Sequence, residues 1–168
     1  MQMDEIFAAD DVAAFRQAFR RHAAGVAIVT ARDTDGTPVG FTATSLASLA
    51  AVPPLATFNM ARVASAWHAI ENTDHVVIHM LGSRDRHLAQ KLSAEASERF
   101  EGDHWHEGPY GLPVLDGVTA WMVGRIVRRI PVEDNAIVAV QIEQGALGDE
   151  DAPLLYHERG YHAPRPLD

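Results

Sequence analysis

The chain has 168 residues, a formal net charge of −9, 47% hydrophobic and 22% charged residues, and no cysteine. This composition is typical of a folded globular protein, and the length suits a single domain over 1–168. The lack of cysteine excludes disulfides, thiolate catalysis and iron–sulfur clusters. The negative charge argues against a nucleic-acid partner, because nucleic acids are bound through clustered Lys and Arg. No apolar run approaches the roughly 20 residues of a membrane helix, and the acidic N-terminus is unlike a signal peptide, so we expect a cytoplasmic protein without a membrane partner.

The N-terminal part of the chain predicts one amphipathic helix and three strands. Apolar residues recur at helical spacing between 10 and 22, and Asp10 or Asp11 is placed to cap the first turn. Asp35-Gly36 is a tight-turn signal between the first two strands. The expected strands cover 26–31, 38–48 and 55–60. The second of them is unusual for a core strand, because small and hydroxyl residues alternate along it.

The remainder of the chain predicts two short helices and four more strands. Ser65 is placed to cap a helix that ends near Asn72, and a second helix is expected over 84–93. We expect a long ordered loop over 101–117, which is rich in Gly, Pro, His and aromatic residues. The expected strands cover 76–81, 119–127, 136–142 and 153–156, with 131–135 as a connection. Short strands at hairpin-like spacing with peripheral helices predict a mainly antiparallel barrel.

Several common kinds of site are disfavoured by the spacing of the residues. His104 and His106 lie two residues apart, but no third ligand accompanies them, so we interpret them as hydrogen-bonding histidines and expect no metal. The chain has no Gly-x-Ser-x-Gly elbow, which argues against a serine hydrolase. It also lacks the Gly-rich phosphate loops of Rossmann and P-loop proteins, so a nucleotide would need a different binding site.

The segment 42–48, with sequence Thr-Ala-Thr-Ser-Leu-Ala-Ser, is the best candidate for such a site. Hydroxyls and free amides on a bending strand can bind the edge of a ring or a phosphate. On local composition alone, a nucleotide site and a hydroxyl-rich edge strand are equally good interpretations. Just before this segment, Gly40 would allow a flat ring to approach, because a side chain there would occupy the space of the ring.

The order of segments from Phe15 to Tyr161 resembles the flavin reductase-like family of split-barrel flavoproteins. Each matching segment is weak alone, but their order and spacing together are specific. The segments are 25–30, 38–42, 45–48, 53–55, 62–70, 111–117 and 153–157. The resemblance implies a mainly β (α+β) fold: an antiparallel Greek-key split β-barrel of the FMN-binding type with flanking helices and a core over about 15–161.

The resemblance also implies where the cofactors bind. FMN or FAD would lie along one strand and a neighbouring strand end, with its phosphate near the following helix, whose exposed amides suit an anion. The implied flavin residues are Val39, Gly40, Phe41, Thr42, Thr44, Ser45, Ser48, Asn59, Met60, Ala61, Ser65, Ala66, Lys91 and Leu92. For NADH or NADPH the implied residues are Asn135, His157 and Tyr161. One departure is that Glu133-Asp134-Asn135 stands where reductases of the family often have Gly-Asp-His, and an amide cannot titrate.

The implied activity is hydride transfer from a reduced nicotinamide to the flavin by a homodimer, with reduced flavin passing to a separate monooxygenase. The chemistry belongs to the cofactors, so no side chain is needed as an acid or base. Because of Asn135, a flavin- or haem-binding split-barrel protein without steady reductase turnover stays an alternative. A third alternative is an assembly scaffold that binds no cofactor, which would leave the hydroxyl-rich strand without a purpose.

Overall fold

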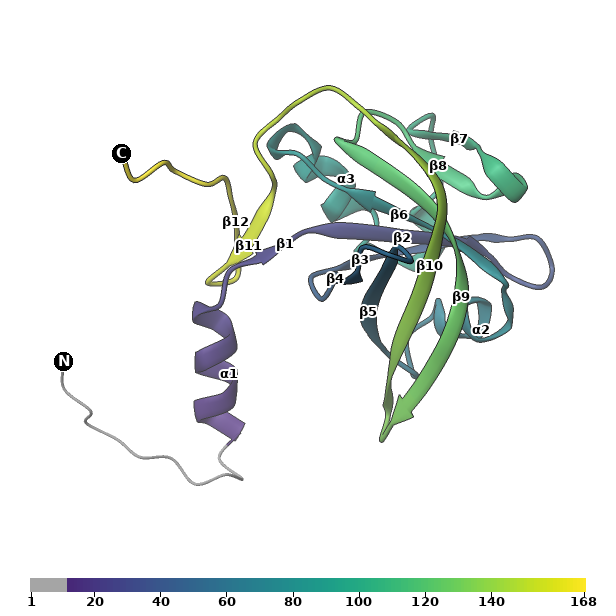
Figure 1. The fold of residues 1–168 in the computed structure, drawn as a ribbon, viewed down its shortest axis with the longest axis horizontal. Helices are drawn as coiled ribbons and strands as arrows, with labels where there is room; N and C mark the ends of the chain where they lie inside the picture. Colours follow the sequence, from purple (N-terminus) through teal and green to yellow (C-terminus); the bar gives the residue numbers. More distant parts are fainter. Residues whose placement is uncertain (1–11) are drawn as a thin grey trace.

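The computed structural model describes residues 12–168 (Figure 1). The expected caps of the first helix, Asp10 and Asp11, lie outside the described residues. The helices are α1 (Val12–Arg21), α2 (Trp67–Asn72) and α3 (Arg86–Lys91), with 3-10 turns η1 (Ser83–Asp85), η2 (Ala96–Glu98) and η3 (Pro109–Gly111). The strands are β1 (Ala24–Gly25), β2 (Ala27–Arg32), β3 (Pro38–Ala43), β4 (Ala47–Ala50), β5 (Leu55–Ala61), β6 (His75–Met80), β7 (Trp105–Glu107), β8 (Pro113–Leu115), β9 (Ala120–Val132), β10 (Asn135–Leu147), β11 (Leu155–His157) and β12 (Gly160–His162).

Seven strands form one antiparallel sheet in the order β3-β2-β6-β9-β10-β5-β4. The two edge strands, β3 and β4, are consecutive in the chain and are joined by residues 44–46 alone. Three residues allow a separation of at most about 14 Å between the strand ends, so the sheet must curl until its edges meet. No ladder joins β3 to β4, and the curled sheet is therefore a barrel that stays open along one seam. The predicted split barrel is confirmed.

Three apolar clusters form the core of the described residues, and the two larger ones hold the barrel together. The inner cluster fills the barrel with side chains from β2, β5, β6 and β10, among them Phe58, Ile78 and Val138. Helix α2 adds Trp67 and Ile70 to this cluster. The outer cluster packs α3 against the opposite face of the sheet, with fully buried side chains that include Ile28, Leu88, Leu92 and Leu115. Burial of these side chains from both faces explains why the strands read as nearly continuous apolar runs.

His79 is a fully buried polar side chain between the sheet and the β7–β8 hairpin. Its Nδ1 lies 3.0 Å from the Ile28 carbonyl oxygen, and its Nε2 accepts a hydrogen bond from the Leu115 amide, also at 3.0 Å. One nitrogen must donate and the other must accept, so the ring is neutral. Burial lowers the pKa of His79 to about 4. The ring therefore fastens β8 to β2 across β6 in its uncharged form.

Each of the seven expected strands overlaps a strand of the structure, although β11 begins two residues after the expected strand 153–156, and four expected segments need correction. The expected strand 38–48 breaks at 44–46, because the chain crosses there from one sheet edge to the other. The expected loop 101–117 contains the β7–β8 hairpin. The expected helix 84–93 is a 3-10 turn followed by the short α3. The expected connection 131–135 is mostly strand, since β9 and β10 are strands of thirteen residues each that form a hairpin closed by two residues.

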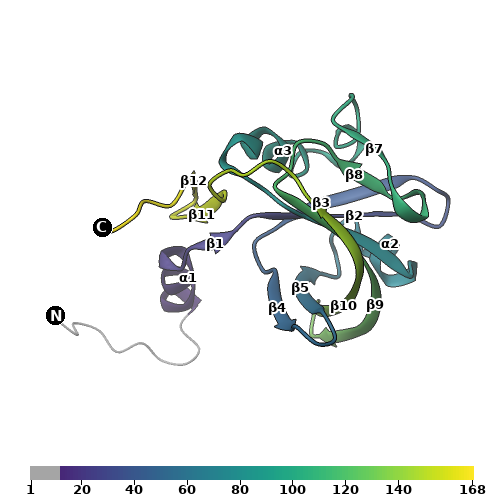
Figure 2. The same cartoon turned by 45° about the horizontal axis from the view of Figure 1, so that its top comes forward.

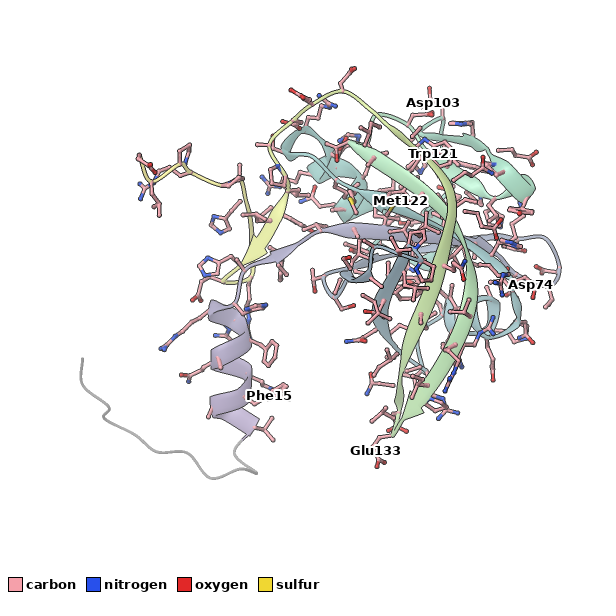
Figure 3. All side chains as sticks on the ribbon, viewed as in Figure 1. Phe15, Asp74, Asp103, Trp121, Met122 and Glu133 are labelled. Carbon is pink, nitrogen blue, oxygen red and sulfur yellow. The ribbon has the colours of Figure 1, made fainter. Side chains whose placement is uncertain are left out.

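Helix α1 stands apart from the barrel in both Figure 1 and Figure 2. It has no buried residue, and Val12, Phe15 and Phe19 are 57–64% exposed. Figure 3 shows Phe15 on this separate helix. The helix adjoins a small sheet of β1, β11 and β12, and we call α1 with this sheet the arm. Among the described residues, no helix is long and apolar enough to cross a membrane.

Candidate functional site

A cleft of about 530 Å³ lies at the open seam of the barrel. Its walls come from the end of β3 and the crossing segment, the end of β5, the turn before α2, and the first residue of β10. The lining residues are Phe41, Thr42, Ala43, Thr44, Ser45, Asn59, Met60, Ala61, Ala64, Ser65, Ala66, Arg99 and Asn135. The volume lies within the range of small-molecule and cofactor sites. Four alanines among the lining residues leave room for a flat ring.

Most of the predicted site residues are brought together here. Ten of them line the cleft: Phe41, Thr42, Thr44, Ser45, Asn59, Met60, Ala61, Ser65, Ala66 and Asn135. Val39 and Gly40 line an adjoining hollow of about 200 Å³, which shares Ser65, Ala66 and Arg99 with the cleft. Ser48, Lys91, Leu92, His157 and Tyr161 are not among the lining residues of either.

The hydroxyl groups of the cleft divide into two kinds. Thr42 Oγ1 donates to the Ala89 carbonyl oxygen at 2.8 Å, which ties β3 to α3. Ser45 Oγ accepts from the Asn59 amide at 2.8 Å and lies 3.2 Å from the Asn59 carbonyl oxygen. Within residues 12–168, the hydroxyls of Thr44 and Ser65 have no such partner. These two hydroxyls are therefore the ones left to bind a ligand.

The reason expected for Gly40 was wrong. A Cβ built on Gly40 would lie 2.9 Å from the Phe100 ring, 3.0 Å from Leu92 Cδ1 and 3.1 Å from Thr30 Cγ2. The space beside this glycine is thus filled by the protein's own side chains. The glycine is required for packing between β3 and the outer cluster, and Leu92 is a fully buried member of that cluster.

The turn before α2 also differs from the prediction. The N-cap of the helix is Ala66, with no side-chain cap, so Ser65 does not cap it as predicted. Helix α2 begins at Trp67, and the Trp67 and Ile70 side chains are both buried in the inner cluster. Ser65 is left exposed one residue before the cap, at the border between the cleft and the hollow.

Asn135 lines the cleft from the tip of the β9–β10 hairpin, near Glu133 at its turn in Figure 3. Glu133 has a φ of 51°, a left-handed conformation that favours glycine. The turn is fixed from outside by Arg62, whose amide donates to the Asp134 carbonyl oxygen at 2.8 Å. Two residues therefore differ from Gly-Asp-His. Asn135 borders the cleft, and Glu133 occupies a turn position whose conformation favours glycine.

His157 and Tyr161 lie together on the arm. They belong to the β11–β12 hairpin, and His157 borders a hollow of about 360 Å³ between this hairpin and α1. Arg86 from α3 lies over the Tyr161 ring at 5.8 Å. Neither side chain reaches the cleft of its own chain, so the prediction that they bind the nicotinamide stays open.

The residues assigned one by one to the cofactors did not include Ala43, which lies within the predicted segment 42–48, nor Ala64 and Arg99. Arg99 is the one charged residue that lines the cleft. Arg99 is distant in sequence from every other lining residue, and no motif marks it. The structure holds Arg99 at the cleft through hydrogen bonds from its side chain to the Ala94 and Gly40 carbonyl oxygens. Nothing in local spacing could have found it.

The histidines of the β7–β8 region make hydrogen bonds. His104 Nε2 lies 2.8 Å from the Arg99 carbonyl oxygen, and His106 Nδ1 lies 2.6 Å from Asp116 Oδ1. In the part of the chain that the structure describes, no group of three or more His, Asp or Glu side chains is arranged to hold a metal ion.

Comparison with known proteins agrees with the fold. The family model of the flavin reductase like domain matches residues 19–165. The chain belongs to the flavin reductase-like family. This family match spans the barrel, every lining residue of the cleft, and the β11–β12 hairpin.

Individual members of the family are similar over nearly the whole length of this chain. The NADH:FMN oxidoreductase of Rhodococcus erythropolis is 41% identical over 158 residues, which cover 91% of this chain and 82% of that protein. The reductase component of the flavin-dependent trigonelline monooxygenase of Acinetobacter baylyi is 30% identical, over 96% of this chain and 52% of that protein. The crystal structure of a flavin reductase domain protein from Arthrobacter sp. FB24 has a TM-score of 0.89 and 51% identity, and covers 93% of this chain and 97% of that one.

Proposed function

We propose that this protein is an NAD(P)H-dependent flavin reductase that supplies reduced FMN or FAD to a separate flavin-dependent monooxygenase. The observation that carries the proposal is the seam cleft, in which nine residues assigned to flavin by sequence resemblance line one cavity together with Asn135, which was assigned to the nicotinamide. Two relatives support the two halves of the proposal, an NADH:FMN oxidoreductase and a monooxygenase reductase component.

The residues of the cleft fit a flavin. Alanines at 43, 61, 64 and 66 leave a flat surface, and the unpaired hydroxyls of Thr44 and Ser65 are available to a polar chain. When bound, the flavin supplies the hydride acceptor and the nicotinamide the donor. The lining residues include no carboxylate, histidine or lysine, so the chain's own part is to hold and orient the two cofactors.

Asn135 is proposed to contact the nicotinamide, because it borders the cleft at the position that the family resemblance assigns to this cofactor. Its amide can donate and accept hydrogen bonds but stays uncharged at any physiological pH. A nicotinamide held by this residue is therefore positioned without an adjacent titrating group.

We also propose a homodimer. The exposed side chains Val12, Phe15 and Phe19 form one apolar face of α1, and nothing within residues 12–168 buries them. A second copy would cover this face, and the arm that carries His157 and Tyr161 is the part of the chain that extends away from its own barrel (Figure 2). We place the protein in the cytoplasm, where reduced nicotinamides are regenerated.

The decisive experiment is an anaerobic titration of the protein and excess FMN or FAD with NADH or NADPH, followed by flavin absorbance. We expect one nicotinamide to bleach one flavin in many turnovers per protein. Retention of flavin without bleaching would instead favour the flavin carrier without steady turnover. Absence of both would refute the proposed function.

A further inference from the structure

The barrel carries an open apolar groove well away from the cleft. Two hollows, of about 460 Å³ and 290 Å³, meet at Met80, which lines both of them, and we call them together the sheet-end groove. Leu147 in its wall is 89% exposed, and Met80 is 40% exposed. Trp121 and Met122, at the start of β9, also line it (Figure 3). Nothing within residues 12–168 covers this apolar surface.

The sheet-end groove and helix α1 carry opposite charges. The helix contains three arginines and no carboxylate: Arg16, Arg20 and Arg21. The chain between the two hollows runs through Asp149, Glu150 and Asp151, which follow Leu147 in one hollow and precede Pro153 in the other. Within the described residues, neither these three arginines nor the carboxylates of Asp149 and Glu150 form an ion pair. A basic apolar helix and an apolar groove with an acidic border are thus both left without a partner.

The helix is held away from the groove of its own chain. The Glu158 amide donates to the Arg20 carbonyl oxygen at 3.0 Å, and β1 pairs with β11, so the end of α1 is fastened to the β11–β12 hairpin. Figure 1 and Figure 2 show the helix standing apart from the barrel. It could reach its own groove only by breaking the arm, so a partner for α1 has to come from another molecule.

Charge decides which surface of a second copy suits α1. Arg16 and Arg20 directly follow Phe15 and Phe19 in the helix and therefore border its apolar face. Two α1 helices packed face to face would bring these arginines of both copies together, and like charges in an interface repel. In the sheet-end groove the same arginines would meet the carboxylates of 149–151. Complementary charge therefore favours the groove over a second α1.

We propose that two copies exchange their arms, so that Phe15 and Phe19 of each α1 enter the sheet-end groove of the other copy and the arginines lie against 149–151. A two-fold dimer makes this contact twice. An aromatic side chain buries about 150–250 Å², so two such contacts cover on the order of 1,000 Å², about the area that a specific interface requires. The inference rests on the proposed homodimer and is independent of the proposed reductase activity.

The first test uses the lack of cysteine in the chain, which makes single-cysteine variants specific probes. Val12→Cys on α1 and Gln144→Cys in the groove leave both phenylalanines in place. The two proteins are mixed, given time to exchange subunits, treated with a short bismaleimide and analysed on a denaturing gel. We expect a covalent dimer in the mixture and in neither variant alone. The control mixture pairs Val12→Cys with Val63→Cys, an 86% exposed position outside the groove, and should give no covalent dimer.

The second test reverses the charges. Arg16→Glu with Arg20→Glu should raise the dimer dissociation constant roughly 10-fold in sedimentation experiments, because two exposed ion pairs are replaced by repulsion. Asp149→Arg with Glu150→Arg in the same chain should restore the dimer. These substitutions lie on the surface of the arm and of the loop after β10, outside the lining of the cleft.

Other results would overturn the inference. A covalent dimer of Val12→Cys with itself would mean that the α1 helices pair with each other. A dimeric parent without a cross-link in the mixture would place α1 elsewhere, and charge reversal without rescue would remove 149–151 from the contact. A parent that sediments as a monomer would refute the proposed homodimer as well. None of these measurements uses flavin or nicotinamide, so failure of the proposed reductase function would be seen separately in the anaerobic titration.

Discussion

The buried His79 makes the stability of this protein depend on pH in a way that can be isolated. Its neutral ring donates to Ile28 and accepts from the Leu115 amide. Protonation of Nε2 would turn the acceptor into a donor, which would then face the Leu115 N–H. We therefore predict that acid weakens the attachment of β8 to the sheet, and that replacing His79 by Gln removes this dependence.

The magnitude follows from the shift of the His79 pKa from 6.5 to about 4. Because the folded pKa is lowered, the unfolded chain binds the proton first, and stability is lost as the pH falls from 6.5 toward 4. A difference of one between the folded and unfolded pKa corresponds to about 1.4 kcal/mol of unfolding free energy. The neutral His79 therefore contributes about 3 kcal/mol to the unfolding free energy above pH 6.5, and this contribution is lost at pH 4.

Urea unfolding at several pH values, followed by tryptophan fluorescence, measures this contribution. The difference in unfolding free energy between the parent and His79→Gln should shrink by about 2 kcal/mol between pH 6 and pH 4.5, since other groups cancel in the difference. His87→Gln, at an exposed position, serves as the control and should show no such change. A difference that stays constant with pH would refute the reasoning, as would a histidine NMR titration in which all nine histidines titrate above pH 5.5.

Three further predictions follow from the cleft and the arm. Asn135→His should change the Michaelis constant for the reduced nicotinamide roughly two- to tenfold in steady-state assays, while an equal change in flavin affinity would place Asn135 elsewhere. Gly40→Ala should lower the unfolding free energy by about 1–3 kcal/mol in urea, because the new Cβ would press on the Phe100 ring; unchanged stability would contradict that packing. Phe15→Ser with Phe19→Ser should convert a dimer to a monomer in analytical ultracentrifugation, and a double variant that stays dimeric would exclude α1 from the interface.

The elements that sequence reasoning predicted well are those whose signals are local. Apolar runs marked the positions of β2, β5 and β6, and Asp35-Gly36 marked the first hairpin. The length of the β9–β10 hairpin was missed because Pro131 suggested an interruption. In the structure Pro131 lies opposite Ala136 beyond the part of β9 that pairs with β6, so that edge of the strand has no partner to lose.

The candidate site was predictable only in part, because its walls come from segments far apart in the chain. Resemblance located the strand, the strand end and the turn that meet at the seam. It could not show that the hydroxyls of Thr42 and Ser45 form hydrogen bonds with backbone atoms of the protein. Nor could it show that the Phe100 ring fills the space beside Gly40. Arg99 was not predicted because its place in the cleft depends on a long-range hydrogen bond to the Gly40 carbonyl oxygen, which leaves no sequence pattern.

The open seam has a consequence for how fast the protein can exchange its ligand. Strands β3 and β4 are joined by covalent chain but by no ladder of hydrogen bonds, and the cleft lies where they meet. A flat molecule can therefore enter or leave without breaking any backbone hydrogen bond of the sheet. We therefore expect ligand exchange to leave the ladders of β2, β6 and β9 intact, so that amide hydrogen exchange in these strands stays slow during turnover. A rigid barrel can in this way release its product to another enzyme in each catalytic turnover.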